Sequence, residues 1–235
     1  MTEPAHGSAG TGAVVHPRLA ARRNAARAST WWGKAWVRAV EESAYAEGDL
    51  AAARSLARSG RVGQITVSSG SFVAAVEDDA GLWTASGTLP VLDEPELSGF
   101  VETVAAESGR IVALLVGELP HGLVEHAEEA GIELVPYGGE LGAACTCDAW
   151  VDPCTHVLAV LYQLAWLLDA DPFVLLQLRG LPRDELLARL HARTEQDPRD
   201  EAGGDDLETG FDAALRAARL LELLERPEAP VEHLF

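Results

Sequence analysis

The first periodic pattern of apolar positions along the chain contains tryptophans. Trp32, Trp36 and Val40 recur every four residues, and alanines fill the neighbouring row. This spacing places apolar side chains on one face of a helix, and Thr30 is a suitable residue to cap its first turn. The pattern predicts an amphipathic helix over residues 31–46, with its tryptophans anchored in the core.

The period of the pattern then shortens from that of a helix to that of a strand. A second predicted helix, residues 50–59, ends at a glycine. Two β-rich segments follow at residues 64–68 and 71–76 on either side of a Ser-Gly turn, and residues 82–87 add a third. We expect a small antiparallel meander within residues 62–92.

Helical spacing returns after the predicted meander. Residues 94–107 have a proline and two glutamates at their start and one apolar face, which predicts a helix. Residues 110–117 and 121–131 read as two further short helices. The run 110–116 stays ambiguous, because a buried strand would show the same apolar composition.

The most apolar segment is residues 157–168, which predict a buried helix because nearly every side of that helix would be apolar. Pro153 disfavours helix before Cys154, so His156 is expected in the first helical turn. Two helices should follow, over residues 172–178 and 182–193. The fold class is therefore α+β, mostly helical with a small antiparallel sheet.

Both ends of the chain lack the apolar content of a core. Residues 1–28 are rich in small residues and arginine and predict a flexible basic arm. Residues 195–210 are acidic and predict a disordered linker. Residues 211–235 combine an amphipathic helix with a proline-rich tail. This helix either returns to cap the core, which we prefer, or docks in a groove of a partner.

Charge is distributed unevenly along the chain. The 235 residues have a formal net charge of −19. Residues 1–62 contain nine basic and five acidic groups, a balance of +4, which leaves −23 for the remainder. Because nucleic-acid affinity comes largely from cationic contacts, only the N-terminal third is expected to touch nucleic acid.

Composition also bears on the compartment. Hydrophobic residues make up 48% of the chain and charged residues 23%, the profile of a soluble globular protein. No apolar run of about 18 residues and no secretory signal pattern is found. We expect a cytoplasmic protein, in a reducing environment that keeps thiols available to metal.

All three cysteines lie within ten residues of one another. Cys145, Cys147, Cys154 and His156 follow the spacing C-x-C, six residues, C-x-H. Three thiols cannot all pair as disulfides, whereas three thiolates and an imidazole suit a tetrahedral zinc ion. The alternative is that these residues merely fill a core. The motif predicts a Cys3His zinc-finger subdomain, with Trp150 available to shield the thiolates from water.

The predicted zinc ion is structural, because four protein ligands leave no position for an activated water. Motifs of P-loop enzymes, α/β-hydrolases and H-E-x-x-H metalloproteases are absent from the sequence. Asp78 and Asp79 read as turn residues. The histidines at 121 and 126, with nearby glutamates, read as a solvated helix face. We expect no enzymatic activity and no catalytic residue.

The cysteine and histidine motif resembles the SWIM zinc finger, whose pattern is C-x-C-x(n)-C-x-H. Three further segments resemble its bacterial members: Trp-Trp-Gly-Lys-Ala-Trp at 31–36, Ala-Arg-Ser-Gly-Arg-Val at 57–62, and Asp-Pro-Phe-x-Leu-Leu-x-Leu-Arg-Gly at 171–180. The resemblance covers about residues 28–181. We predict that residues 29–136 form an N-terminal helical and β-meander region, and that residues 137–194 form the SWIM-type zinc finger with its following helices.

The resemblance implies a zinc-binding module for DNA or protein contacts, and its bacterial members are commonly linked to Swi/Snf-type helicases. It implies Cys145, Cys147, Cys154 and His156 as zinc ligands. Many relatives have a lysine where this chain has Thr155, and a proline in place of Asp148. The missing lysine weakens the argument for phosphate contact.

Three functions remain as hypotheses. The first is an interaction protein that docks on a Swi/Snf-type ATPase, without membrane association. The second is direct binding of DNA or RNA, with arginines 18–27 as cations and Trp31 and Trp32 as a stacking face. The third is a redox or zinc-level sensor, which would need exposed thiolates.

Overall fold

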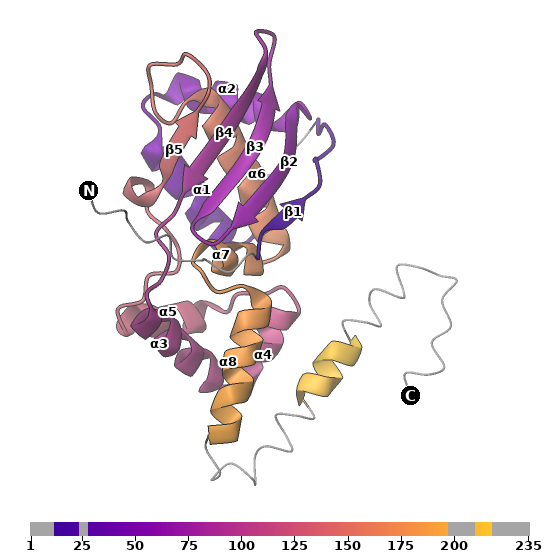
Figure 1. The fold of residues 1–235 in the computed structure, drawn as a ribbon, viewed down its shortest axis with the longest axis vertical. Coiled ribbons are helices and arrows are strands. Elements are labelled where there is room, and N and C mark those ends of the chain that lie inside the picture. The colour runs from indigo at the N-terminus through magenta and orange to yellow at the C-terminus, as the bar shows by residue number, and fades with distance from the viewer. Residues whose placement is uncertain (1–11, 24–27, 197–209, 218–235) are drawn as a thin grey trace, which may run out of the picture.

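The computed structural model describes residues 12–23, 28–196 and 210–217. It has an α+β fold in which one antiparallel sheet packs against a buried helix, with further helices beside that helix and below the sheet (Figure 1). The helices of the described chain are α1 Trp31–Ser43, α2 Glu47–Arg58, α3 Glu94–Ala105, α4 Ser108–Leu115, α5 His121–Glu129, α6 Thr155–Ala170, α7 Phe173–Leu178 and α8 Arg183–Gln196, with a 3-10 turn, η1, at Gly138–Glu140.

The sheet has five strands in the order β1-β2-β3-β4-β5, all antiparallel. The strands are β1 Val14–His16, β2 Val62–Ser68, β3 Ser71–Glu77, β4 Leu82–Thr88 and β5 Gly142–Cys145. The expected meander is confirmed as β2, β3 and β4. Its first turn places Gly70 at a φ of 69°, a conformation that glycine adopts without strain.

Two edge strands were not expected from the sequence. Residues 1–28 were assigned to a flexible arm, but Val14–His16 pairs with Ile65–Val67 of β2. Further along the same segment, the Arg18 Nε donates to the Gly60 carbonyl at 2.7 Å. β5 pairs with β4, where Cys145 lies opposite Ala85. Strands of three or four residues are too short to produce an alternating pattern, so pairing with a longer neighbour defines them.

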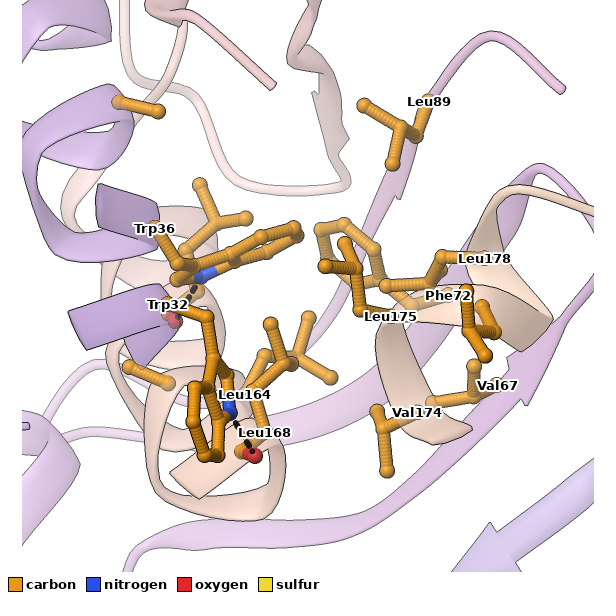
Figure 2. Packing of buried hydrophobic residues seen from close by; sticks show 14 of the residues in the cluster. Trp32, Trp36, Val67, Phe72, Leu89, Leu164, Leu168, Val174, Leu175 and Leu178 are labelled. Carbon is orange, nitrogen blue, oxygen red and sulfur yellow. Dashed lines mark hydrogen bonds between the residues drawn. The ribbon is translucent and has the colours of Figure 1, made fainter. Parts of the chain in front are cut away.

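The core is organised around α6, which lies behind the sheet in Figure 1. Most of its side chains are buried, as its uniform apolar composition predicted. The Trp32 and Trp36 indoles of α1 donate hydrogen bonds to the Leu168 and Leu161 carbonyls at 2.8 and 3.0 Å (Figure 2). The expectation that these tryptophans anchor the core is confirmed.

The remaining helices agree with the sequence pattern. The Thr30 side chain caps α1 by accepting from the Gly33 N–H, and Asp93 with Glu96 forms a capping box at α3. The ambiguous run at residues 110–116 is helical, within α4. Helices α3, α4, α5 and α8 form a group below the sheet in Figure 1. No helix among the described residues is long and apolar enough to cross a membrane.

The predicted regions 29–136 and 137–194 share one hydrophobic core, since α6 packs against both α1 and α2. Most of the predicted linker, residues 197–209, lies outside the described residues. Of the expected C-terminal helix, residues 210–217 are helical, and the Phe211 ring lies 5.3 Å from that of His191 in α8. The tail beyond residue 217 is also outside the described part of the chain.

Candidate metal centre

The structure brings the four predicted ligand residues together. Their Sγ and imidazole nitrogen atoms all lie within 4.8 Å of one another. Cys145 ends β5, Cys147 follows two residues later, Cys154 is the N-cap residue of α6, and His156 lies in the first turn of that helix. The cluster therefore joins one edge of the sheet to the start of the central helix.

The geometry of the cluster suits a tetrahedral cation. His156 Nδ1 lies 3.8 Å from Cys145 Sγ and 3.9 Å from Cys154 Sγ. Ligands on a tetrahedral zinc ion, with bonds of about 2.0–2.3 Å, are roughly 3.5–3.8 Å apart. The three thiols and the imidazole present the donor set and the spacing that a structural metal site requires.

The other nitrogen of His156 has its own partner. Nε2 lies 3.0 Å from the Asp78 Oδ2. The Asp78 Oδ1 accepts from the Ala80 and Gly81 backbone N–H groups and from the Trp83 indole. Hydrogen bonds from Trp83 and His156 hold the pKa of Asp78 well below its usual range. A carboxylate on Nε2 leaves Nδ1 free of a proton and directed at the metal position.

Asp78 is the functional residue that the sequence analysis missed. Its interpretation as a turn residue is correct, because its carboxylate closes the turn before β4. Its contact with His156 spans 78 positions of sequence and depends on the packing of α6 against the sheet. The sequence predicted only that Asp78 lies in a turn, and no sequence pattern connected it with the cysteines.

The three thiols have different acidities in the absence of metal. Burial raises the pKa of Cys154 to about 12 and also raises that of Cys145. Burial raises the pKa of Cys147 as well, but the Ala149 backbone N–H, His156 and the neighbouring thiols lower it further, to about 7. Cys147 therefore supplies the thiolate that is most available to a metal ion at neutral pH.

Trp150 does not shield the thiols, contrary to expectation. Its side chain is 83% exposed, and its ring lies edge-on to Tyr45 with 5.4 Å between the ring centroids. The tryptophan beside the cluster is Trp83, whose ring centroid is 5.9 Å from that of His156. The Trp150 ring is instead turned toward Tyr45, away from the thiols.

Other candidate residues lie apart from the cluster. The Trp32 indole is buried and offers no free stacking face, whereas Trp31 is half-buried, donates to the Leu119 carbonyl and contacts the Trp32 and His121 rings edge-on. The Arg22 guanidinium lies 5.0 Å from the Trp166 ring. His121 pairs with Glu125 on α5. Within the described ranges, the Cys3His cluster is the one group of side chains spaced to hold a metal ion.

Comparison with known proteins agrees with this geometry. The family model described as "SWIM zinc finger" matches residues 130–165, which contain all four clustered side chains. The chain is 31% identical over 167 residues to "Uncharacterized protein Rv2102" of Mycobacterium tuberculosis. That alignment covers 70% of this chain and 60% of the mycobacterial protein. No solved structure matches the chain.

The matched segment begins at the end of α5 and reaches into α6, so it includes β5, the cysteine loop and the first turns of the central helix. Sequence motif, spacing of the donor atoms and family match thus coincide on the same residues. Residues 130–165 of this chain are therefore a SWIM-type zinc finger.

Proposed function

We propose that this protein is a non-catalytic, zinc-stabilised interaction module that acts as an accessory protein of a Swi/Snf-type ATPase in the cytoplasm. The observation that carries the proposal is the donor set. Three thiols and an imidazole converge on one position, with all ligand atoms within 4.8 Å of one another. A metal held by four protein ligands has no open position for substrate or activated water.

Cys145, Cys147, Cys154 and His156 would hold the zinc ion. When bound, zinc supplies a cross-link, because it joins the end of β5 and the cysteine loop to the start of α6. The protein's own residues then hold the loop in one conformation. A loop fixed in this way presents its side chains to a partner at a low entropic cost.

Charge favours a protein partner over nucleic acid. The chain beyond residue 62 has nine basic and 32 acidic groups, which gives it a formal net charge of −23. Such a surface repels phosphate and attracts a basic protein surface. Arg18 and Arg22 of the predicted basic arm already contact Gly60 and Trp166.

Affinity purification from the native host tests the proposal. The tagged chain should recover a Swi/Snf-type ATPase, and a Cys147→Ser, Cys154→Ser variant should recover much less of it at equal protein level. Repeated purifications without such an ATPase would contradict the proposal. A gel-shift titration across salt concentrations tests the alternative, since direct nucleic-acid binding would weaken steeply with salt.

A further inference from the structure

The loop that closes the metal cluster exposes one aromatic ring, which contacts a second exposed ring from the turn between α1 and α2. Trp150 is 83% exposed and Tyr45, between α1 and α2, is 71% exposed. Their rings contact each other edge-on at 5.4 Å, so they form one aromatic surface from segments far apart in sequence. Two adjoining exposed aromatic rings form a contiguous apolar patch, the kind of surface that is often used for interaction.

A hollow of about 260 Å³ is lined by the residues on either side of Trp150 in the sequence, Ala149 and Val151. Ala143 and Ala144 of β5 line it together with Ala149, Val151 and Asp152 of the loop and the three cysteines. The hollow includes the metal position, because three of the four ligand side chains line it. A water molecule occupies about 30 Å³, so the hollow is larger than the metal ion alone requires. Its walls are small apolar side chains, with one carboxylate and the thiol groups as polar features.

The sequence segment that contains most of the residues lining the hollow has acidic side chains but no lysine or arginine. Residues 111–178 contain ten carboxylates and no lysine or arginine. Asp148 and Asp152 are exposed on either side of Trp150, and neither forms an ion pair with any residue that the structure describes. The cations closest in sequence to Tyr45 are engaged, because Arg38 pairs with Glu42 and Arg54 with Glu41. Three thiolates and a dication would add a further net negative charge.

We propose that the hollow and the Tyr45–Trp150 pair form the docking site for an arginine-containing segment of the partner protein. One arginine stem lies along Ala149 and Val151, and its guanidinium pairs with Asp152 and stacks on an aromatic ring. Arginine fits better than lysine because its planar group both stacks on aromatic rings and pairs with a carboxylate through two hydrogen bonds. This inference rests on the proposed function and names the partner chemistry of the same loop.

Charge argues against the other occupants of this surface. A nucleic acid could stack on Trp150, but its phosphates would approach the exposed carboxylates of Asp148 and Asp152. A second copy of the chain would bring an identical acidic surface against this one. A basic protein segment is the occupant whose charge and shape both match.

Fluorescence anisotropy with the zinc-loaded full chain tests the docking site. The probe is a labelled peptide of alternating arginine and glycine, with a lysine-glycine peptide of equal length for comparison. Trp150→Ala and Asp152→Asn should each weaken arginine-peptide binding roughly fivefold or more, since a cation–π contact or a partly desolvated pair contributes about 1 kcal/mol. The lysine peptide should bind more weakly to the wild-type chain.

Matched controls separate a specific site from diffuse attraction. Val116→Ala removes another exposed apolar side chain, at the C-cap of α4, and Glu133→Gln removes one exposed charge outside the loop. Both should stay within about twofold of wild type, as surface substitutions usually do. Equal weakening by the controls, absence of peptide binding, or tighter Trp150-dependent binding of a labelled single-stranded oligonucleotide would each overturn the docking site.

The same variants distinguish this inference from the proposed function. If Trp150→Ala and Asp152→Asn recover the ATPase from the native host as well as wild type does, the docking site is wrong and the proposed function stands. If no ATPase is recovered but the arginine peptide binds in a Trp150-dependent manner, the docking site stands and the proposed partner is wrong. Far-ultraviolet circular dichroism confirms that these exposed substitutions leave the fold intact.

Discussion

At the scale of single residues, the contact between Asp78 and His156 decides how the histidine can serve the cluster. The Asp78 carboxylate holds Nε2 at 3.0 Å, and Nδ1 faces the thiols of Cys145 and Cys154. An imidazole held in this way is a better ligand, because its ring orientation and its tautomer are both set before metal arrives.

Asp78→Asn should lower zinc affinity about 10- to 100-fold, the usual effect of removing such a partner. The amide keeps the size of the side chain but loses the charge that favours a proton on Nε2. Competition with a chromophoric chelator measures the affinity. Asp79→Asn is the matched control, because Asp79 is exposed and pairs with Arg61 rather than with the cluster. Equal affinities for the two variants would show that Asp78 acts only in the turn.

Zinc binding should release roughly two to three protons per chain near neutral pH. Burial raises the pKa of Cys145 and of Cys154, the latter to about 12, so both are protonated in the metal-free chain, whereas Cys147, with a pKa of about 7, is partly ionised. Because protons compete with the metal for the thiolates, affinity should fall as the pH is lowered. Calorimetry in buffers with different ionisation enthalpies counts the protons. Release of less than one proton would mean that the thiols are already ionised.

At the scale of elements, a buried arginine at the end of α7 connects segments that lie far apart in the sequence. Arg179 is 2% exposed. It donates to the Leu134 and Pro90 carbonyls at 2.9 Å and to the Glu140 carboxylate of η1 at 3.1 Å. Since η1 also packs against α1, Arg179 supports the segment that leads into β5 and the cysteines.

Arg179→Met should destabilise the protein by about 3–5 kcal/mol, because it leaves the Glu140 carboxylate without its partner in a mostly buried position. Arg193→Met is the control, since its ion pair with Glu102 is exposed and should contribute about 0–1 kcal/mol. Urea unfolding followed by circular dichroism gives both values. A loss below 1 kcal/mol for Arg179→Met would mean that water replaces the guanidinium.

Long periodic elements and the metal motif could be predicted from sequence, and short or tertiary features could not. The helix at Trp31–Ser43 and the meander over β2–β4 carry their own pattern, and the four clustered side chains lie within a dozen residues. β1 and β5 depend on pairing with distant strands. Asp78 depends on a contact across 78 positions, and the orientation of Trp150 depends on Tyr45, which lies in another segment.

At the scale of the whole molecule, the hydrophobic core is continuous and extends well beyond the metal cluster. It includes residues of the sheet, of α1 and α2, and of the helices below the sheet, all gathered around α6. The cluster lies at one end of α6, while the indoles of Trp32 and Trp36 hold the carbonyls of Leu168 and Leu161 further along that helix. The metal therefore stabilises the loop and the first turn of α6, whereas the core, which includes Cys154, extends well beyond them.

Chelation of the metal should unfold the cysteine loop but leave most of the protein folded. Helical ellipticity should fall only slightly, because the buried face of α6 does not depend on the ligands. Hydrogen exchange should show rapid exchange at residues 142–154 and retained protection in the second half of α6. Loss of the whole helical signal on adding a chelator would show that the core cannot fold without its cross-link.

The position of β5 gives this local opening a further consequence. β5 forms one edge of the sheet, and edge strands present unpaired backbone groups that can join strands of other molecules. In the folded chain β5 ends at a cysteine after four residues. Without metal, Cys145 would no longer fix the end of this edge strand. We therefore expect metal starvation to favour aggregation through this edge well before the core itself unfolds.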